Sequence, residues 1–506
     1  MSALRKLAGQ TAIYGLSSIV ARFLNFLLTP LYTSKGVFPP AEYGVITSLY
    51  AWAAFLNIVL TFGMETAFFR FSTRQPEAVP PEGGATPIPR KIYGTAFFSI
   101  ASIAMPFMVI GSLLASPIAN SIGFPGFGTA VLMLVITLGL DALTVIPMAR
   151  LRQEGKAWRF VSINILHMVV NIGLNLFFIA YWMRGDAAGK TDLFLGDLYD
   201  PAFGVGYVFL ANLIAWIVKF LVLVPRMPFF SGLDRSLIKP MFVFAAPLMI
   251  AGLAGMVNET ADRILLKYLL PADIADHEIG IYGACYKLSI LITLFIQAFR
   301  YAAEPFFFSH AKEKESRATF ARIMDLFVAF CMIAFLVVML FLDVFKHFIP
   351  NPEYWEGLRV VPILMLANVF LGIYYNQSVW YKLSDRTRTG GMIALIGAAI
   401  TIGLNLLLIP IIGYMGSAWA TLACYSAMAA ISYALGQKHW PVPYHVGRIL
   451  LYMAGGVFLW WAVERFLGDL EDTAGWIVRG FVLLFFMAAV ILKELPKGLG
   501  SDRNAR

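Results

Sequence analysis

The chain has 506 residues, of which 59% are hydrophobic and 14% are charged. Soluble domains carry about 25% charged residues, so this composition excludes an ordinary soluble globular protein. The net charge of +9 comes from basic residues dispersed between apolar segments, so it predicts no nucleic acid partner.

The N-terminus contains a candidate membrane helix. Arg5 and Lys6 precede an apolar stretch that runs from Thr11 to Tyr32. The apolar core of a signal peptide is about 7–15 residues long and is followed by a small-residue cleavage site, and this stretch has neither feature. It therefore predicts the first transmembrane helix.

Further apolar segments follow, each long enough to cross a hydrocarbon core about 30 Å thick. In the first half they are Tyr43–Phe69, Ile92–Ala115, Phe127–Ala149, Trp158–Trp182 and Ala202–Val224. In the second half they are Pro240–Leu266, Ile279–Ala303, Phe320–Leu342, Leu358–Tyr381, Gly390–Ile412 and Met415–Leu435, followed by Val446–Phe466 and Trp476–Leu492. The pattern predicts an all-α polytopic membrane protein with about fourteen transmembrane helices.

The charges of the connecting loops predict the orientation. Alternate loops are basic, with Arg70, Arg74, Arg90, Lys91, Arg150, Arg152, Lys156, Arg159, Arg226, Arg235, Lys239, Lys312, Lys314, Arg317, Arg322, Lys382, Arg386 and Arg388. The opposite loops contain Asp186, Asp192, Asp197, Asp200, Asp273, Asp276, Glu278, Asp469, Glu471 and Asp472. Because Lys and Arg favour cytoplasmic loops, both termini are expected in the cytoplasm.

Three short motifs recur in the second half of the chain in the same order, at offsets of about 230–239 residues. The matched pairs are Glu42–Ile46 with Glu278–Tyr282, Glu65–Phe69 with Glu304–Phe308, and Asn171–Leu176 with Thr401–Leu406. We therefore expect an N-terminal lobe of six helices (1–230), a related C-terminal lobe of six (231–440), and a segment of two helices with a cytoplasmic tail (441–506). An even number of helices per lobe makes the repeat parallel, with a substrate path between the lobes.

The 6+6+2 arrangement and these motifs resemble the polysaccharide transporter branch of the multidrug/oligosaccharidyl-lipid/polysaccharide exporter superfamily. The resemblance implies a flippase for an undecaprenyl-diphosphate-linked oligosaccharide, a polysaccharide or O-antigen precursor, in the bacterial cytoplasmic (inner) membrane. It also implies coupling to H⁺ or Na⁺, contact with membrane lipid, and a polysaccharide polymerase as a candidate partner. A lipid II-type flippase and a multidrug exporter of the same superfamily remain alternatives.

Charged side chains near the bilayer centre are costly and therefore mark candidate sites. Arg22 lies in mid-span, and Asn25 and Thr29 share its helical face. A guanidinium at that depth is suited to a diphosphate, so Arg22 and Asn25 are candidate substrate-binding residues. An ion pair of Arg22 with Asp141 or with an acid of helix seven is the structural alternative.

A second set of charges lies in helices seven and eight. Glu259 and Arg263 are spaced for an i, i+4 pair, and Lys287 is positioned to neutralise Asp262. Arg263 and Lys287 are candidate substrate-binding residues, and Glu259, Asp262 and Asp141 are candidate ion-coupling residues. A static network between the lobes explains the same cluster.

The sequence contains no nucleophile–base arrangement, phosphate-binding loop or metalloprotease motif, so neither an enzyme nor a cofactor nor a metal site is predicted. The alternative from another class is a membrane glycosyltransferase or polysaccharide polymerase. Such enzymes usually need a substantial outer loop, and the loop near Arg184–Pro201 is short.

Overall fold

The computed structural model describes residues 23–74, 90–190, 194–229, 232–310, 316–384, 386–467 and 473–494. Every regular element in these ranges is helical, and thirteen helical stretches are long and apolar enough to cross a membrane. A shorter apolar helical segment, Phe23–Tyr32, precedes them. The predicted all-α membrane fold is confirmed, although the expected first helix from Thr11 lies largely outside the described residues.

The first half of the chain contains α2 (Thr29–Tyr32), α3 (Pro40–Thr61), α4 (Met64–Arg74), α5 (Arg90–Leu113), α6 (Ala115–Ser121), α7 (Gly128–Gln153), α8 (Ala157–Asn175), the π-helix η1 (Leu176–Met183), α9 (Arg184–Ala187), η2 (Gly196–Leu198), η3 (Pro201–Phe203), α10 (Gly206–Leu223) and η4 (Val224–Arg226). The second half contains α11 (Arg235–Leu269), α12 (Ala272–His310), α13 (Ser316–Leu340), α14 (Leu342–Phe345), η5 (Lys346–Phe348), η6 (Pro352–Val360), α15 (Val361–Gln377), α16 (Val379–Leu383), α17 (Thr387–Ile412), α18 (Tyr414–His439), α19 (Val446–Leu467) and α20 (Thr473–Glu494).

The boundaries of several helices follow from local sequence. Helix α3 begins at Pro40, where proline is tolerated because the first-turn N–H groups need no helical partner. It ends where Phe62 and Gly63 adopt positive φ, and α4 continues the same span after this break. Helix α11 begins after Asp234, whose carboxylate accepts a hydrogen bond from the backbone N–H of Ser236.

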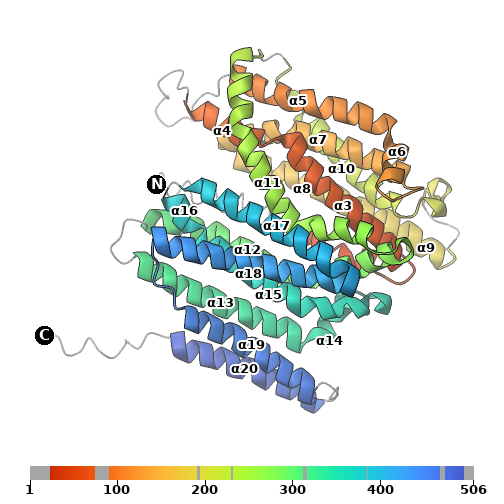
Figure 1. Cartoon of the computed structure of the whole chain (residues 1–506). Helices are drawn as coiled ribbons and strands as arrows, with labels where there is room; N and C mark the ends of the chain where they lie inside the picture. The colour runs from red at the N-terminus through yellow and green to blue at the C-terminus, as the bar shows by residue number, and fades with distance from the viewer. Residues whose placement is uncertain are drawn as a thin grey trace. The chain divides into compact units, whose positions relative to one another are not determined.

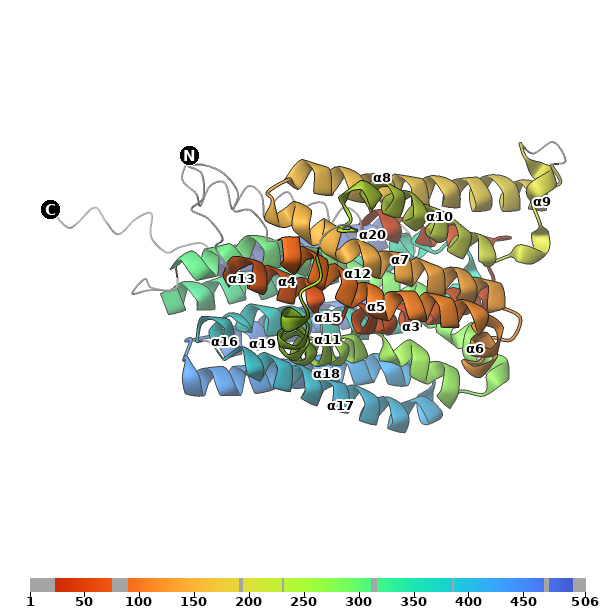
Figure 2. The ribbon, with the colours of Figure 1, turned by 90° about the horizontal axis from the view of Figure 1, so that it is seen from above.

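The Cα atoms group into two compact units. The first unit comprises Met1–Lys287, Ile349–Leu358 and Gly391–Cys424, and the second comprises Leu288–Phe348, Arg359–Gly390 and Tyr425–Arg506. Within the first unit α7 packs against α3, α5 and α10, while α8 and α10 lie side by side (Figures 1 and 2). Within the second unit α13 packs against α15, α19 and α20. The predicted lobe boundaries describe the sequence repeat and stay a prediction.

The two halves of the repeat use equivalent asparagines in the same way. Asn175 donates from Nδ2 to the carbonyl oxygen of Asn171 (2.8 Å) and accepts a hydrogen bond from the Tyr32 hydroxyl (2.7 Å). Asn405 donates to the carbonyl oxygen of Thr401 (2.7 Å) and accepts from the Ser417 hydroxyl (2.8 Å). Each asparagine thus joins its helix to a neighbour through one hydroxyl group, as polar amides commonly do between membrane helices.

Another pair of repeat-equivalent residues lies where α3 crosses α12. A Cβ atom added to Gly44 would lie 1.9 Å from the carbonyl oxygen of Asp276, and one added to Gly280 would lie 1.8 Å from that of Pro40. Pro40 and Asp276 are separated in the sequence by the same number of residues as Gly44 and Gly280, so they are also equivalent positions of the repeat. The two backbones therefore touch through matched positions, which only glycine permits and which fits a parallel repeat.

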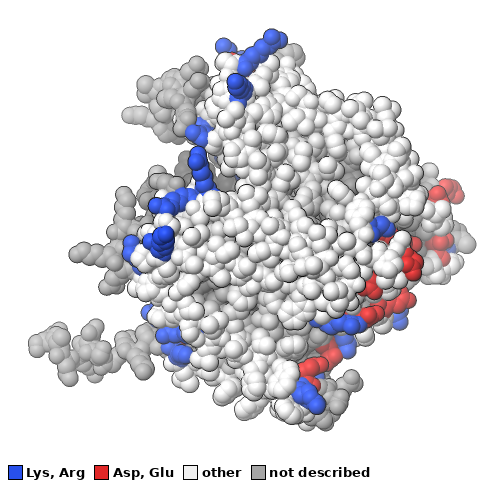
Figure 3. Space-filling view, in the orientation of Figure 1, with Lys and Arg blue, Asp and Glu red and all other residues white. Residues whose placement is uncertain are grey.

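The charged residues separate along the helices of each unit. On the face seen in Figure 3, most Lys and Arg side chains lie at one end of the helices and most Asp and Glu side chains at the other. In the second unit, for example, Arg317 lies in the first turn of α13 and Asp343 lies beyond its last turn. This separation is the one expected from the loop charges, and the membrane side of each end stays a prediction.

Candidate functional site

The predicted charge cluster of α11 forms a closed network around Asp262. Its Oδ1 accepts hydrogen bonds from the backbone N–H of Arg263 (2.9 Å) and from Arg263 Nη1 (3.1 Å). Its Oδ2 accepts a hydrogen bond from the Tyr282 hydroxyl (2.6 Å). Both charged side chains are buried. Burial of a charge is tolerated here because each carboxylate oxygen has a hydrogen-bond donor and the guanidinium has a counter-charge.

The pairing within this cluster differs from the expected one. Arg263 Nη1 donates to the backbone carbonyl of Glu259 (2.6 Å), and its ion pair is with Asp262. Its guanidinium also lies 4.1 Å from the ring centre of Tyr286. Glu259 is exposed, and Lys287 is half-buried and forms no ion pair with any described residue. Asp262 is thus neutralised by its sequence neighbour, which helical spacing alone does not suggest.

Asp141 belongs to a second intramembrane cluster, formed by α3, α7 and α10. Asn57 donates from Nδ2 to Asp141 Oδ2. Lys219 is buried, its charge interacts with that of Asp141, and its Nζ lies 4.3 Å from the ring centre of Trp216. Although Lys219 lies near the end of its helix, it is held inside the bundle beside Asp141.

Two more polar side chains border this cluster. The ring of His167 lies 4.6 Å from that of Trp216, and its Nε2 is buried without a partner among the described residues. Asn212 donates from Nδ2 to the Tyr50 hydroxyl (2.9 Å), while its Oδ1 is buried and has no such partner. The site therefore combines one carboxylate, one ammonium group and two buried groups with unused hydrogen-bonding capacity.

The other predicted substrate residues lie near the start of the described chain. Arg22 lies outside the described residues. Asn25 is exposed, and Thr29 on the same predicted face is buried. The proposed role of Arg22 and Asn25 therefore stays a prediction.

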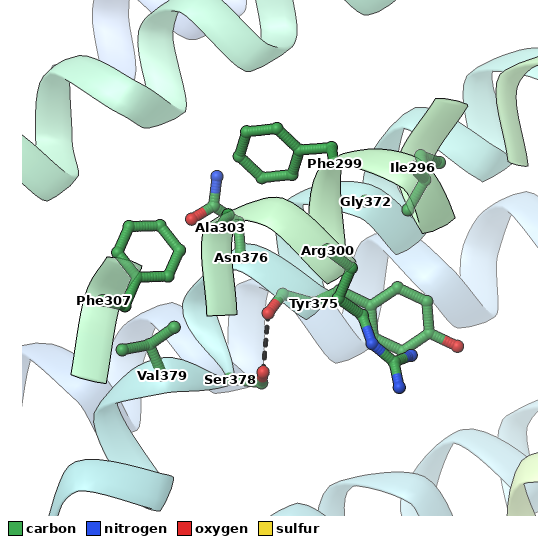
Figure 4. Close-up of a pocket in the computed structure, with 10 residues that line it drawn as sticks. All are labelled: Ile296, Phe299, Arg300, Ala303, Phe307, Gly372, Tyr375, Asn376, Ser378 and Val379. Atoms are coloured by element: carbon green, nitrogen blue, oxygen red, sulfur yellow. Dashed lines mark hydrogen bonds between the residues drawn. The ribbon is translucent and has the colours of Figure 1, made fainter. Parts of the chain in front are cut away.

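A cavity in the second unit was not predicted. It has a volume of about 300 Å³, part of which is open to the surroundings, and lies between α12, α15 and the start of α16. Its walls are mostly apolar, and Figure 4 shows the ten residues that line it: Ile296, Phe299, Arg300, Ala303, Phe307, Gly372, Tyr375, Asn376, Ser378 and Val379.

The polar groups of this cavity are few and specific. The guanidinium of Arg300 lies 5.0 Å from the ring centre of Tyr375, on one side of the cavity (Figure 4). The amide of Asn376 is on the other side, near Phe299 and Phe307, and its Nδ2 is buried without a partner among the described residues. Arg300 is exposed, and no ion pair joins it to another side chain that the structure describes. An apolar hollow with an exposed guanidinium at its edge suits an amphiphile with an anionic head.

A third network joins α13 to α19 and α20. Asp325 is fully buried, with Oδ2 2.8 Å from His445 Nδ1 and 2.9 Å from Arg448 Nη1. Glu494 accepts a hydrogen bond from the Tyr452 hydroxyl (2.5 Å) and lies 3.4 Å from Arg448 Nη1. This network fixes the two C-terminal helices to α13. No cluster of metal-ligating side chains is found among the described residues.

The chain is similar in sequence to one known family and in structure to several transporters. The family model described as "Polysaccharide biosynthesis protein" matches residues 7–311. No curated protein matches the chain. The lipid II flippase MurJ, in an inward closed conformation, superimposes with a TM-score of 0.70 at 14% identity, covering 95% of this chain and 99% of that chain.

A multidrug resistance MATE family transporter of the MOP superfamily, in an inward-facing conformation, gives a TM-score of 0.62 at 12% identity, covering 86% of this chain and 96% of that chain. The structure of MATE in complex with MaL6 superimposes with a TM-score of 0.58 at 12% identity, covering 90% of this chain and 100% of that chain. These likenesses define a polytopic membrane protein with the fold of the multidrug/oligosaccharidyl-lipid/polysaccharide (MOP) superfamily. More specifically, the chain belongs to the family of polysaccharide biosynthesis proteins, because that family's model matches more than half of it. The resemblance stated from the sequence motifs is confirmed.

Proposed function

We propose that this protein flips an undecaprenyl-diphosphate-linked oligosaccharide from the cytoplasmic to the outer leaflet of a bacterial cytoplasmic membrane by alternating access. Membership of the polysaccharide biosynthesis family supports a saccharide cargo, and the superfamily fold supports transport. The observation that carries the proposal is the cavity of Arg300, because it combines an apolar hollow with an exposed guanidinium. A polyprenyl diphosphate has the matching parts, an apolar chain joined to an anion.

The location of Arg300 suits a cargo that enters from the cytoplasmic leaflet. It lies near the end of the membrane-spanning part of α12, Ala272–Tyr301, which leads into a basic loop. In the proposed orientation that end is at the level of the inner-leaflet headgroups. Arg22, Asn25 and Lys287 are also proposed as substrate-binding residues. Arg263 is proposed mainly to hold Asp262, because its charge is already neutralised.

Coupling to H⁺ or Na⁺ is proposed at Asp141. Protonation of Asp141 would remove the counter-charge of buried Lys219, and Na⁺ binding would compete with Lys219 for the carboxylate. Either event changes the balance of charges between α7 and α10. Asp262 is a weaker candidate because the Tyr282 hydroxyl and Arg263 already occupy both of its oxygens. Glu259 is exposed and stays a secondary candidate.

Arg300→Ala tests the proposed substrate contact. In proteoliposomes with a fluorescent undecaprenyl-diphosphate-linked saccharide, the initial flipping rate should fall at least about tenfold, because hydrogen bonds to charged groups contribute roughly 1.5–3 kcal/mol. Arg300→Lys should retain an intermediate rate, and Arg388→Ala, at another exposed arginine, should retain the wild-type rate. A wild-type rate for Arg300→Ala would refute the proposed contact. In cells, loss of the protein should make the lipid-linked saccharide accumulate in the inner leaflet.

A second candidate is a lipid II-type flippase, favoured by the extensive match to MurJ. Measuring the flipping rates of lipid II and of a lipid-linked oligosaccharide in the same proteoliposome preparation distinguishes the two proposed cargoes. Helices α19 and α20 argue against a small-drug exporter, since the multidrug branch usually has twelve helices. We further propose that the protein performs no chemistry on its cargo and acts beside a polysaccharide polymerase.

A further inference from the structure

A second hollow lies within the second unit, at the end of the bundle opposite its basic end. It has a volume of about 490 Å³, part of which is open to the surroundings, and it is lined by residues of α13, α14, α19 and α20. Met339, Leu340, Leu342 and Val463 form its apolar lining. Asp343, Trp460, Glu464 and Arg479 form its polar lining. Neither the proposed cargo path nor the proposed coupling site uses these residues.

One of the lining residues of this hollow, Arg479, is a buried cation. Only 5% of Arg479 is exposed, and its Nη1 donates to Asp343 Oδ2 at 2.9 Å. Lys346 donates from Nζ to Asp343 Oδ1 at 2.9 Å. The hydrogen bond from Lys346 lowers the pKa of Asp343, so this carboxylate is charged at neutral pH. Asp343 therefore accepts from both side chains, and the remaining N–H groups of Arg479, which have no acceptor among the described residues, can donate to an additional anion.

Helix α19 contributes a negative charge to the lining. Glu464 lies on the same face of α19 as Trp460 and Val463, is exposed, and forms no ion pair or hydrogen bond with any described residue. The lining of the hollow thus includes a carboxylate from α19 and a guanidinium from α20. This arrangement is complementary to a small zwitterion whose ammonium group can donate hydrogen bonds.

The surroundings of the hollow are those of a lipid-facing surface. Phe458 and Trp461 of α19 and Ile477 and Phe481 of α20 are large apolar side chains, each at least half exposed. Exposed apolar side chains on a membrane-spanning helix contact acyl chains. Trp460 adds an amphipathic ring of the kind found at headgroup level. A headgroup in the hollow would therefore have its acyl chains beside it.

We propose that this hollow binds the headgroup of a zwitterionic phospholipid with a primary ammonium, of the phosphatidylethanolamine type. Its phosphate accepts hydrogen bonds from Arg479, and its ammonium donates to Glu464. In the proposed orientation the site faces the outer leaflet. The lipid would hold α13, α19 and α20 together at the end opposite the Asp325 network.

Native mass spectrometry of the purified full-length protein tests this site. Phosphatidylethanolamine, phosphatidylcholine and phosphatidylglycerol with identical acyl chains are titrated, and the bound lipid is counted. Phosphatidylethanolamine should bind about tenfold more tightly than phosphatidylcholine, because the trimethylated ammonium has no N–H to donate. Glu464→Gln should bring this ratio close to one. Asp273→Asn, at an exposed carboxylate at the start of α12, should leave it unchanged.

Glu464 is exposed, so the Glu464→Gln variant should fold normally. The Arg479→Gln variant also breaks the ion pair with Asp343, so its melting temperature must be measured alongside its lipid binding. Equal binding of the ethanolamine and choline lipids by the wild type would overturn the proposal. So would an unchanged ratio in Glu464→Gln. Displacement by a hexosamine, without any preference for the ethanolamine lipid, would assign the hollow to a saccharide and refute the lipid site.

Discussion

Asp262 and Arg263 are consecutive residues that neutralise each other inside the first unit. Breaking a buried ion pair by removing one partner typically costs about 3–5 kcal/mol, because an uncompensated charge remains. The Tyr282 hydroxyl would also lose a charged acceptor. These contacts favour a structural role for the pair over a role in ion exchange.

Asp262→Asn should therefore lower the melting temperature of the purified protein by several degrees, with little change in the ion dependence of transport. Combining it with Arg263→Gln should recover part of the loss, since no charge is then left unpaired. A normal melting temperature together with an altered H⁺ or Na⁺ dependence would support coupling at Asp262 instead.

Asp141→Asn tests the other carboxylate. If Asp141 exchanges the coupling ion, this variant should lose stimulation by an imposed pH or sodium gradient and retain slow, gradient-independent flipping. The measurement is the flipping rate in proteoliposomes with and without each gradient. Full stimulation in the variant would contradict coupling at Asp141. Asp141→Asn also leaves Lys219 buried without a counter-charge, so Asp141→Asn with Lys219→Gln provides the variant matched for charge.

The sequence shows which residues need a partner more clearly than which partner each one has. Asp141 and Arg263 stand out because each lies inside an apolar span. Their contacts with Asn57 and Tyr286 depend on how the helices are rotated about their axes. Almost uniformly apolar spans have too little periodicity to predict that rotation. Arg300 was missed because a charge near a helix end is ordinarily explained by the adjacent headgroups.

At the scale of elements, most spans could be predicted because the bilayer demands long, internally hydrogen-bonded apolar helices. The interruption at Phe62–Gly63 was not predicted, and neither was the π-helix η1, which directly follows Asn175. Both depend on a few backbone torsions within an apolar segment that hydropathy treats as uniform. The matched glycines Gly44 and Gly280 were visible in the sequence. That they mark a close backbone contact between α3 and α12 became clear only from the structure.

Gly280→Ala should separate α3 from α12, because the added Cβ would overlap the carbonyl oxygen of Pro40. We expect a lower melting temperature and reduced transport. Gly403→Ala is the matched control: it also lies within a helix, but a Cβ there would meet no atom within 4 Å. That variant should be neutral or slightly stabilising, since alanine favours a helix over glycine by about 1 kcal/mol. Equal behaviour of the two variants would show that the crossing contributes nothing.

At the scale of the whole molecule, orientation follows from charge placement and can be measured directly. The native cysteines Cys285, Cys331 and Cys424 are buried and should not react with a membrane-impermeant maleimide. A cysteine introduced at Asp273 should label in intact cells. One introduced at Lys91 should label only after permeabilisation. The reverse pattern would invert the proposed topology and move the ethanolamine-lipid site to the inner leaflet.

The contact between Gly44 and Gly280 also has a kinetic consequence. It is made by backbone atoms alone, so separating and rejoining the two helices there requires no side chain to change rotamer. A glycine loses no side-chain entropy when it is covered, unlike the long side chains that close many interfaces. A crossing of this kind can therefore part and re-form without any side chain becoming trapped in a misplaced rotamer.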